Sequence, residues 1–181
     1  MFDNVTKSIR VLSAGSVEKA NSGHPGMPLG MAEVGTVLYK NFLKISNDCP
    51  SWINRDRFVL SAGHGSALLY SLLHFNGFDI SIDDMKNFRQ LKSKTPGHPE
   101  LDTKLGIDIT TGPLGQGFAT GVGLALAESY LSKTFGDKII NHFTYGIVSD
   151  GDLMEGLSQE AAELAALWGL GKLIYIFDDN N

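Results

Sequence analysis

Acidic and amide side chains follow two apolar runs near the end of the chain. Asp150 comes after HFTYGIVS, and the cluster Asp178, Asp179 and Asn180 comes after KLIYIF. Carboxylate and amide oxygens are ligands that Mg²⁺ or Ca²⁺ prefers, and water and phosphate oxygens can fill the remaining positions. Gly151 would let the backbone approach a phosphate at the start of a helix. These residues indicate either a metal–phosphate site or, as the plainer alternative, solvated turns and helix caps.

Three of the five histidines follow a glycine in segments that interrupt helices. They are His24 in SGHPG, His64 in AGHGS and His98 in PGHPE. Imidazoles in such loops are poorly placed for core packing and well placed to donate a hydrogen bond or shuttle a proton. His74, in an apolar helix, and His142, at a strand start, are expected to be structural.

Other ligand-binding patterns are incomplete. No two histidines have the spacing of zinc ligands, and Cys49 has no cysteine partner. TGPLGQG (111–117) is rich in glycine and precedes a helix, but it lacks the lysine of a P-loop and the spacing of a dinucleotide fingerprint. This segment could therefore hold a phosphate or a ring, and its own sequence does not decide which.

The elements that must position these residues follow from the spacing of apolar side chains. Strands at 142–150 and 172–177 flank a helix, which makes a βαβ unit and predicts an α/β fold, a parallel sheet with helices on both faces. The carboxyl ends of the two strands then meet at one edge of the sheet, where ligands bind in such folds. The expected buried face of the intervening helix is Met154, Leu157, Ala161, Leu164, Ala165 and Trp168. The other expected elements are helices at 4–20, 27–43, 66–77, 83–91 and 115–136, a strand at 57–61 and a long irregular segment at 92–114.

Composition limits the class of protein. The chain has 181 residues, 43% of them hydrophobic and 19% charged, which suits one soluble globular domain. The net charge of −5, without a basic run, disfavours nucleic acid as a partner. No apolar stretch is long enough to span a membrane, and the single cysteine suits a reducing compartment, so a cytoplasmic location is expected.

Six motifs together resemble the N-terminal, diphosphate-binding domain of transketolase. They are SGHPG, DRFVLSAGHGS, FRQLKSKTPGHPE, TTGPLGQG, DGDLMEG and FDDN, and they cover nearly the whole chain in the order of that family. The resemblance implies the thiamine-diphosphate-binding fold. It also implies a thiamine-diphosphate- and Mg²⁺-dependent (or Ca²⁺-dependent) transfer of a two-carbon ketol unit between sugar phosphates, in the pentose phosphate pathway.

The same resemblance assigns roles to individual residues. Asp150 and Asn180 would hold the metal, with Gly151 and Asn180 also against the cofactor. His64 would contact its diphosphate, and His24 and His98 would face the reacting groups of the donor sugar. The remaining matches are Gly112, Pro113 and Leu114, along the aminopyrimidine side of the cofactor, and Glu155 and Glu160, at a dimer interface.

Two departures from the family pattern stand out. Ser149 replaces the first glycine of the metal motif, which would matter if that position required a positive φ. The chain also ends one residue after Asn180, whereas the family uses a main-chain carbonyl two residues beyond it. We expect residues 1–181 to be a partial diphosphate-binding domain without the pyrimidine-binding and C-terminal domains. Such a chain would be inactive alone and would depend on a homodimer or a partner chain that carries the pyrimidine-binding domain.

Two alternatives remain at the level of the sequence. One is a related thiamine-diphosphate enzyme, dihydroxyacetone synthase or deoxyxylulose-phosphate synthase. TPGHPE and TTGPLGQG fit the transketolase and dihydroxyacetone synthase branch better. The other alternative is a non-catalytic cofactor-binding or interaction fragment, with an exposed edge strand that favours association.

Overall fold

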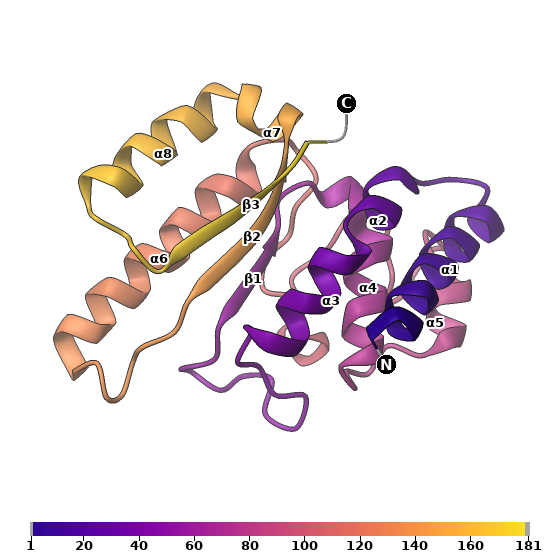
Figure 1. Cartoon of the computed structure of the whole chain (residues 1–181), viewed down its shortest axis with the longest axis horizontal. Coiled ribbons are helices and arrows are strands. Elements are labelled where there is room, and N and C mark those ends of the chain that lie inside the picture. The colour runs from indigo at the N-terminus through magenta and orange to yellow at the C-terminus, as the bar shows by residue number, and fades with distance from the viewer. Residues whose placement is uncertain (1, 180–181) are drawn as a thin grey trace.

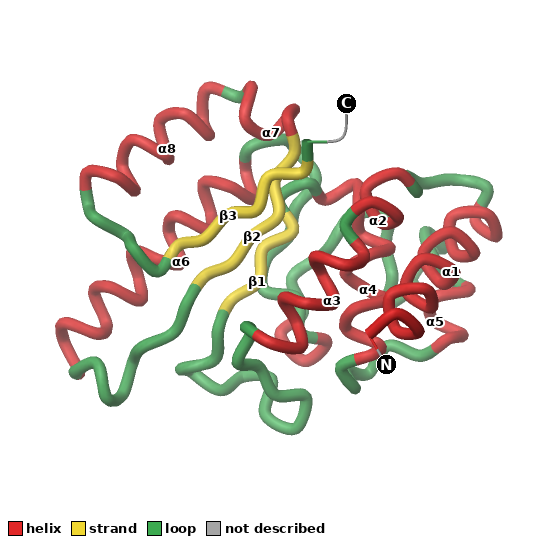
Figure 2. Tube along the Cα trace, viewed as in Figure 1, coloured by secondary structure: helices red, strands yellow, loops and turns green. Residues whose placement is uncertain are grey.

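The computed structural model describes residues 2–179, which form a parallel sheet with helices on both faces (Figures 1 and 2). The strand order is β1-β2-β3, so β2 is central. The predicted α/β class is therefore confirmed. Of the helices in the described part of the chain, none combines the length and apolar character needed to cross a membrane. The strands are β1 (Arg57–Leu60), β2 (Thr144–Ser149) and β3 (Leu173–Asp178).

The helices form two groups, one on each face of the sheet (Figure 1). The first group is α1 (Phe2–Ala20), α2 (Gly26–Gly30), α3 (Ala32–Asn41), α4 (Ser66–Phe75) and α5 (Ile82–Lys86). The second is α6 (Gln116–Phe135) and α8 (Gly156–Leu167), with the short α7 (Asp150–Met154) at the end of β2. Short 3₁₀ turns are η1 (Gly63–Gly65) and η2 (Thr103–Leu105).

The side chains of β2 alternate between the two helix groups. Tyr145 and Ile147 belong to the larger core, with the apolar side chains of α3 and α4. Val148 packs on the opposite face with Phe118 of α6 and Ala161 of α8. Since helices cover both faces, β2 is buried along its whole length, as expected for a central parallel strand.

Several predicted boundaries differ from the structure. The predicted helix 27–43 is two helices, because the chain leaves α2 at Gly30, a residue with low helix propensity, and resumes as α3. The predicted helix 83–91 starts one residue earlier and ends at Lys86. Apart from η2 and one isolated bridge, residues 92–114 are irregular, as the sequence predicted.

The predicted buried face of the helix after β2 is only partly right. Ala161 is buried and Ala165 is partly buried against the same cluster, but the prediction is wrong for the larger side chains Met154, Leu157, Leu164 and Trp168. Within α8 the buried side chains are Ser158 and Ala161, whereas Leu164 is 41% exposed and Trp168 beyond it 44%. The reason is that α8 packs against α6 through small side chains, which allow the two helices to approach closely. The larger apolar side chains of α8 therefore remain on its outer surface.

Candidate active site at the carboxyl edge of the sheet

The segments that follow the three strands meet at one edge of the sheet. In the register of the sheet, Ser149 at the end of β2 is paired with Asp178 at the end of β3. The turn η1, which follows β1, contains His64. Asp150 begins α7 directly after β2. The predicted meeting of the two acidic strand ends is therefore confirmed, and β1 adds a histidine to the same edge.

The three glycine-flanked histidines come from loops far apart in the sequence and lie near one another. The rings of His24 and His64 contact edge to face, with centroids 5.2 Å apart. His98 lies against Gly112, where an added Cβ would be 3.5 Å from the imidazole. The structure thus places these histidines beside the TGPLGQG segment, at the carboxyl edge of the sheet.

The surroundings of two of these imidazoles favour their neutral form. Burial and then the neighbouring His24 lower the pKa of His64, while Asp152 acts in the opposite direction. Partial burial and then the Arg89 guanidinium lower the pKa of His98. Because an ordinary histidine has a pKa near 6.5, both rings are neutral at pH 7, and each can donate a hydrogen bond from one nitrogen and accept one at the other.

Asp150 presents a free carboxylate at this edge. Its side chain is exposed and makes no hydrogen bond or ion pair with any residue from Phe2 to Asp179. Gly151 follows, and an added Cβ there would lie 3.2 Å from Leu114, so the metal motif and the TGPLGQG segment are in contact. Asn180, the other predicted metal ligand, lies outside the described residues. Within residues 2–179 no group of three or more His, Cys, Asp or Glu side chains is arranged to hold a metal.

Ser149, the departure in the metal motif, has an extended backbone, with φ −108° and ψ 172°. Extended backbone suits any residue, so the position does not require glycine. The serine instead forms a capping box at the start of α7 with Asp152. The Ser149 N–H donates to Asp152 Oδ2 over 3.1 Å, and the Asp152 N–H donates to Ser149 Oγ over 3.4 Å. The substitution is therefore compatible with the fold.

Asp152 is a site residue that the sequence reasoning missed. Its carboxylate is fully buried and accepts hydrogen bonds from Gly115 N–H (2.9 Å) and Ser61 Oγ (3.0 Å), besides those from Ser149. It therefore joins the end of β1, the end of β2 and the start of α6. The signal available in the sequence was the capping-box spacing between Ser149 and the acid three residues later.

Gly115 fixes how the TGPLGQG segment enters α6. Its φ of +77° is in the left-handed region that favours glycine. An added Cβ would also lie 2.9 Å from both Glu155 Cβ and Ser158 Oγ. The predicted interface residue Glu155 is thus next to this loop, whereas Glu160 lies further along α8, and both are exposed.

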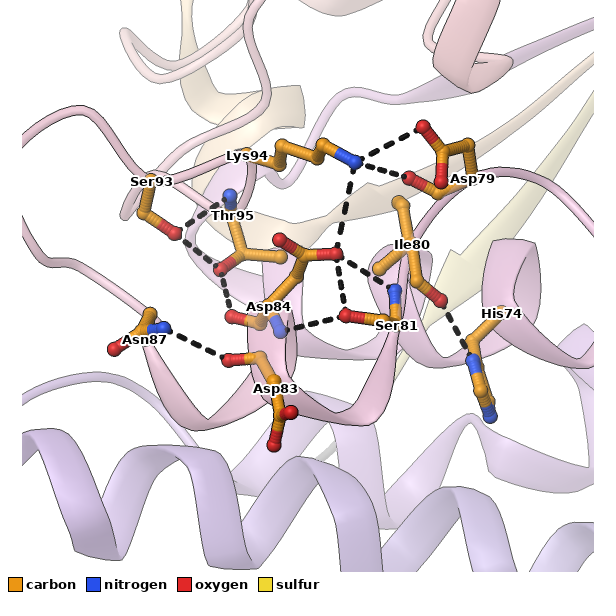
Figure 3. Close-up of polar contacts among 10 residues, drawn as sticks. All are labelled: His74, Asp79, Ile80, Ser81, Asp83, Asp84, Asn87, Ser93, Lys94 and Thr95. Carbon is orange, nitrogen blue, oxygen red and sulfur yellow. Dashed lines mark hydrogen bonds and ion pairs between the residues drawn. The ribbon is translucent and has the colours of Figure 1, made fainter.

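The loop that carries His98 is anchored to α5 (Figure 3). Thr95 Oγ1 donates to the Asp84 carbonyl over 2.7 Å. Lys94 Nζ lies 2.9 Å from Asp79 Oδ2 and 3.8 Å from Asp84 Oδ2. From α4, Ser66 Oγ donates to the Gly97 carbonyl over 2.8 Å. An irregular segment held by side chains in this way can keep the His98 imidazole in a fixed place.

The two histidines expected to be structural lie away from this edge. His74 Nδ1 is 2.6 Å from the Ile80 carbonyl oxygen, so the ring bonds to the turn before α5 (Figure 3). His142 is buried beside the opposite, amino end of β2. Neither lies among the residues of the candidate site.

The residues present fit a metal-bound diphosphate. A free carboxylate is a hard oxygen ligand of the kind that Mg²⁺ binds. Gly151 beside it leaves room for a phosphate to approach the backbone, and the half-buried imidazole of His64 lies in the turn that follows the neighbouring strand, β1. Thr111 Oγ1, next to Gly63, is buried without a hydrogen-bond partner among the described residues, which is typical of a site that is completed by a further group.

An open parallel sheet with its polar residues at the carboxyl edge defines an α/β cofactor-binding domain. Residues 2–181 match the family described as "Transketolase, thiamine diphosphate binding domain". The chain belongs to this family.

Relatives of the chain are much longer than it is. It is 57% identical over 177 residues to a transketolase of Bacillus subtilis, which covers 96% of this chain and 26% of that protein. It is 56% identical over 179 residues to transketolase 1 of Vibrio cholerae, covering 97% of this chain and 27% of that protein. The crystal structure of transketolase from Campylobacter jejuni matches with a TM-score of 0.96 and 52% identity, over 99% of this chain and 28% of that one. Transketolase from Leishmania mexicana matches with a TM-score of 0.95 and 50% identity, over 98% of this chain and 27% of that one. The chain therefore spans about a quarter of the length of the relatives that it matches.

Proposed function

We propose that this chain supplies the metal- and diphosphate-binding half of a transketolase active site. The reaction is the transfer of a two-carbon ketol unit from a ketose phosphate to an aldose phosphate. The single observation that carries the proposal is the unpaired Asp150 carboxylate, at the sheet edge where His64 and the TGPLGQG segment also lie. The family to which the chain belongs is consistent with that chemistry.

In this proposal Asp150 and Asn180 hold Mg²⁺, and Ca²⁺ is the other cation of suitable chemistry. His64 and Gly151 contact the diphosphate. The Gly112–Leu114 backbone lies along the aminopyrimidine side of the cofactor. When bound, thiamine diphosphate supplies the electron sink for cleavage of the ketose.

His24 and His98 are the proposed substrate-facing residues. Each can donate a hydrogen bond where negative charge develops on a sugar oxygen, and a donor already in place costs no reorganisation at that moment. The lowered pKa of His98 keeps that ring neutral, so it can hold a proton on one nitrogen and accept one on the other.

The partners proposed for the chain are sugar phosphates and a second subunit. Glu155 and Glu160 are exposed, and beside them Met154 is 80% exposed, which suits a surface that a homodimer or a chain with the pyrimidine-binding domain would cover. We place the reaction in the pentose phosphate pathway and in the cytoplasm, where a lone free cysteine such as Cys49 is ordinary.

The experiment that tests this function is a calorimetric titration of thiamine diphosphate into the purified chain, first with Mg²⁺ and then with EDTA. We expect metal-dependent binding that Asp150→Ala weakens by about a hundredfold or more, because the variant removes a metal ligand outright. Asp137→Ala is the matched control, since Asp137 is an exposed carboxylate beyond the end of α6.

Binding that neither EDTA nor Asp150→Ala weakens would contradict the metal assignment. A folded chain that binds no cofactor would favour the second candidate, an interaction fragment. The observation behind that candidate is apolar exposure on the outer surface, where Leu167 is 77% exposed and Phe177 47%. A related enzyme, dihydroxyacetone synthase or deoxyxylulose-phosphate synthase, would bind the cofactor equally and would differ in the sugars it uses.

A further inference from the structure

The buried carboxylate of Asp152 joins three segments of the candidate site. Its Oδ1 accepts hydrogen bonds from Ser61 Oγ over 3.0 Å and from Gly115 N–H over 2.9 Å. Its Oδ2 accepts from Ser149 N–H over 3.1 Å and from Ser149 Oγ over 3.3 Å. The donors therefore lie just after β1, at the end of β2 and just before α6.

The charge of this carboxylate makes the arrangement specific. Two of its partners are backbone N–H groups, which can only donate, so the acceptor-only carboxylate is the form that fits. Asp152 is fully buried and forms no ion pair with any residue in the described part of the chain. Loss of one donor would leave a buried charge short of a partner, which is more costly than loss of an apolar contact.

The loop at 111–115 depends on Asp152 for its position. Apart from the Asp152 carboxylate, which accepts from Gly115 N–H, no side chain of the described residues is hydrogen-bonded to the backbone of this loop. At the other end of the loop, Thr111 N–H donates to the Pro99 carbonyl over 3.1 Å. The loop is thus fixed at both ends, and Asp152 provides the attachment to the metal motif.

The loop in turn contacts residues that are proposed to act on the cofactor and the substrate. Gly112 lies against the imidazole of His98, where an added Cβ would be 3.5 Å from the ring. Leu114 lies beside Gly151, where an added Cβ would be 3.2 Å from Leu114 Cδ1. A shift of the loop would therefore change the surroundings of both ends of the site.

Through Ser61, Asp152 also holds the turn that carries His64. The Ser61 hydroxyl donates to Asp152, and the Ser61 carbonyl accepts from Gly63 N–H over 2.7 Å. Thr111 packs on the same turn, since an added Cβ at Gly63 would lie 2.6 Å from Thr111 Oγ1. The loop and this turn are therefore in contact, and Asp152 is bonded to both.

We infer that Asp152 is a positioning residue for the proposed reaction, which fixes the loop 111–115 and the turn of His64 in the places that a bound diphosphate cofactor requires. The part that concerns the cofactor rests on the proposed function, whereas the placement of loop and turn rests on the hydrogen bonds alone. Because Asp152 is fully buried, it acts only through its neighbours Ser61, Ser149 and Gly115. A site whose parts are already in place binds with a smaller loss of conformational freedom.

The test compares Asp152→Asn with Asp56→Asn in the full 181-residue chain. Asp56 is the matched control, because its buried carboxylate also accepts two backbone N–H bonds, from Lys44 over 2.8 Å and from Phe143 over 2.7 Å. It precedes β1, at the opposite end of the sheet from the candidate site. Both variants lose a buried carboxylate, so both should be less stable than the unmodified chain.

The first measurement is made without cofactor. Relative to the rest of the chain, only Asp152→Asn should speed amide hydrogen exchange in residues 61–65 and 111–115. Only this variant should shift the NMR signals of the His64 and His98 rings. The same exchange pattern and the same ring signals in the two variants would mean that Asp152 has a general structural role, and would overturn the inference.

The second measurement is the calorimetric titration of thiamine diphosphate with Mg²⁺. We expect Asp152→Asn to weaken binding about tenfold or more, and Asp56→Asn to leave it unchanged, since only the first variant removes a partner that orients the site. Equal affinity in Asp152→Asn and the unmodified chain would contradict the inference. If the unmodified chain binds no cofactor, the proposed function fails, while exchange and NMR still decide whether Asp152 positions the loop and the turn.

Ser61→Ala covers the case in which Asp152→Asn does not fold. This variant removes one donor and leaves the charge of Asp152 in place, so a shift of the His64 ring signal reports a change of position and not of charge. We expect that shift together with faster exchange in residues 61–65, and unchanged exchange in residues 111–115. A His64 signal and an exchange rate equal to those of the unmodified chain would show that Asp152 does not hold the turn.

Discussion

Asp152 is a single residue on which the geometry of the candidate site depends. Its buried carboxylate accepts hydrogen bonds from Ser149 N–H and Oγ, Ser61 Oγ and Gly115 N–H. Asp152→Asn keeps the shape but turns an NH₂ group toward some of these donors. We expect a loss of roughly 2–3 kcal/mol in the free energy of unfolding, measured by urea denaturation.

The control for this prediction is Asp137→Asn, at an exposed position without a hydrogen bond among the described residues. A surface change of this kind should alter the free energy of unfolding by less than about 0.5 kcal/mol. If Asp152→Asn unfolded at the same urea concentration as the unmodified chain, Asp152 would not be the link between the ends of β1 and β2.

At the scale of elements, the irregular segment 92–114 depends on α5 for its position. Thr95 is fully buried, and its hydroxyl bonds to the Asp84 carbonyl and to Ser93 Oγ (Figure 3). Thr95→Val has the same shape but removes the buried hydroxyl that donates to this carbonyl, which keeps only its hydrogen bond from Asn87 N–H. We expect a loss of about 1 kcal/mol in the free energy of unfolding and faster amide hydrogen exchange in residues 92–100.

Thr134→Val is the matched change elsewhere in the chain. Thr134 Oγ1 donates to the Tyr130 carbonyl over 2.8 Å on the exposed side of α6. Loss of this hydrogen bond should leave the free energy of unfolding nearly unchanged, because water can replace the hydroxyl there. Amide hydrogen exchange near His98 should also be unchanged. Equal exchange at residues 92–100 in the two variants would show that α5 does not hold the loop.

At the scale of the whole molecule, the pH dependence of stability reflects His142 at the amino end of the sheet. Burial, and then the cations Arg57, Lys172 and Arg55, lower the pKa of His142 to about 4. The unfolded chain binds a proton at His142 near pH 6.5, whereas the folded chain binds it only near pH 4. The contribution of His142 to the free energy of unfolding is therefore full above pH 6.5 and is lost as the pH falls from 6.5 to 4. We expect a loss on the order of 2 kcal/mol across that window, measured by urea denaturation at a series of pH values.

His142→Phe keeps a flat ring that cannot take up a proton, and it isolates this effect. Carboxylates and the other histidines titrate in both proteins, so they cancel in the difference. The variant should lose less stability than the unmodified chain between pH 6.5 and 4. Parallel pH profiles in the two proteins would show that His142 is not responsible.

The sequence by itself determined the class of fold and the edge of the sheet where the candidate site lies. Apolar runs of strand length around a helix require a parallel sheet, and its topology brings Asp150 and Asp178 together. These features can be inferred from the sequence because strands, helices and the residues at their ends depend mainly on neighbours in the chain. The sequence also placed His24, His64 and His98 in loops, although it could not show that those loops meet.

Only the tertiary structure decided which distant residues touch. Asp152 reads as an ordinary acid until Ser61 and Gly115 are found against it. The outer face of α8 was mispredicted for the same reason, since apolar periodicity shows that a helix has a face but not what packs on it. Burial, pairing and pKa depend on contacts across the fold, and these contacts exist only once the chain has folded.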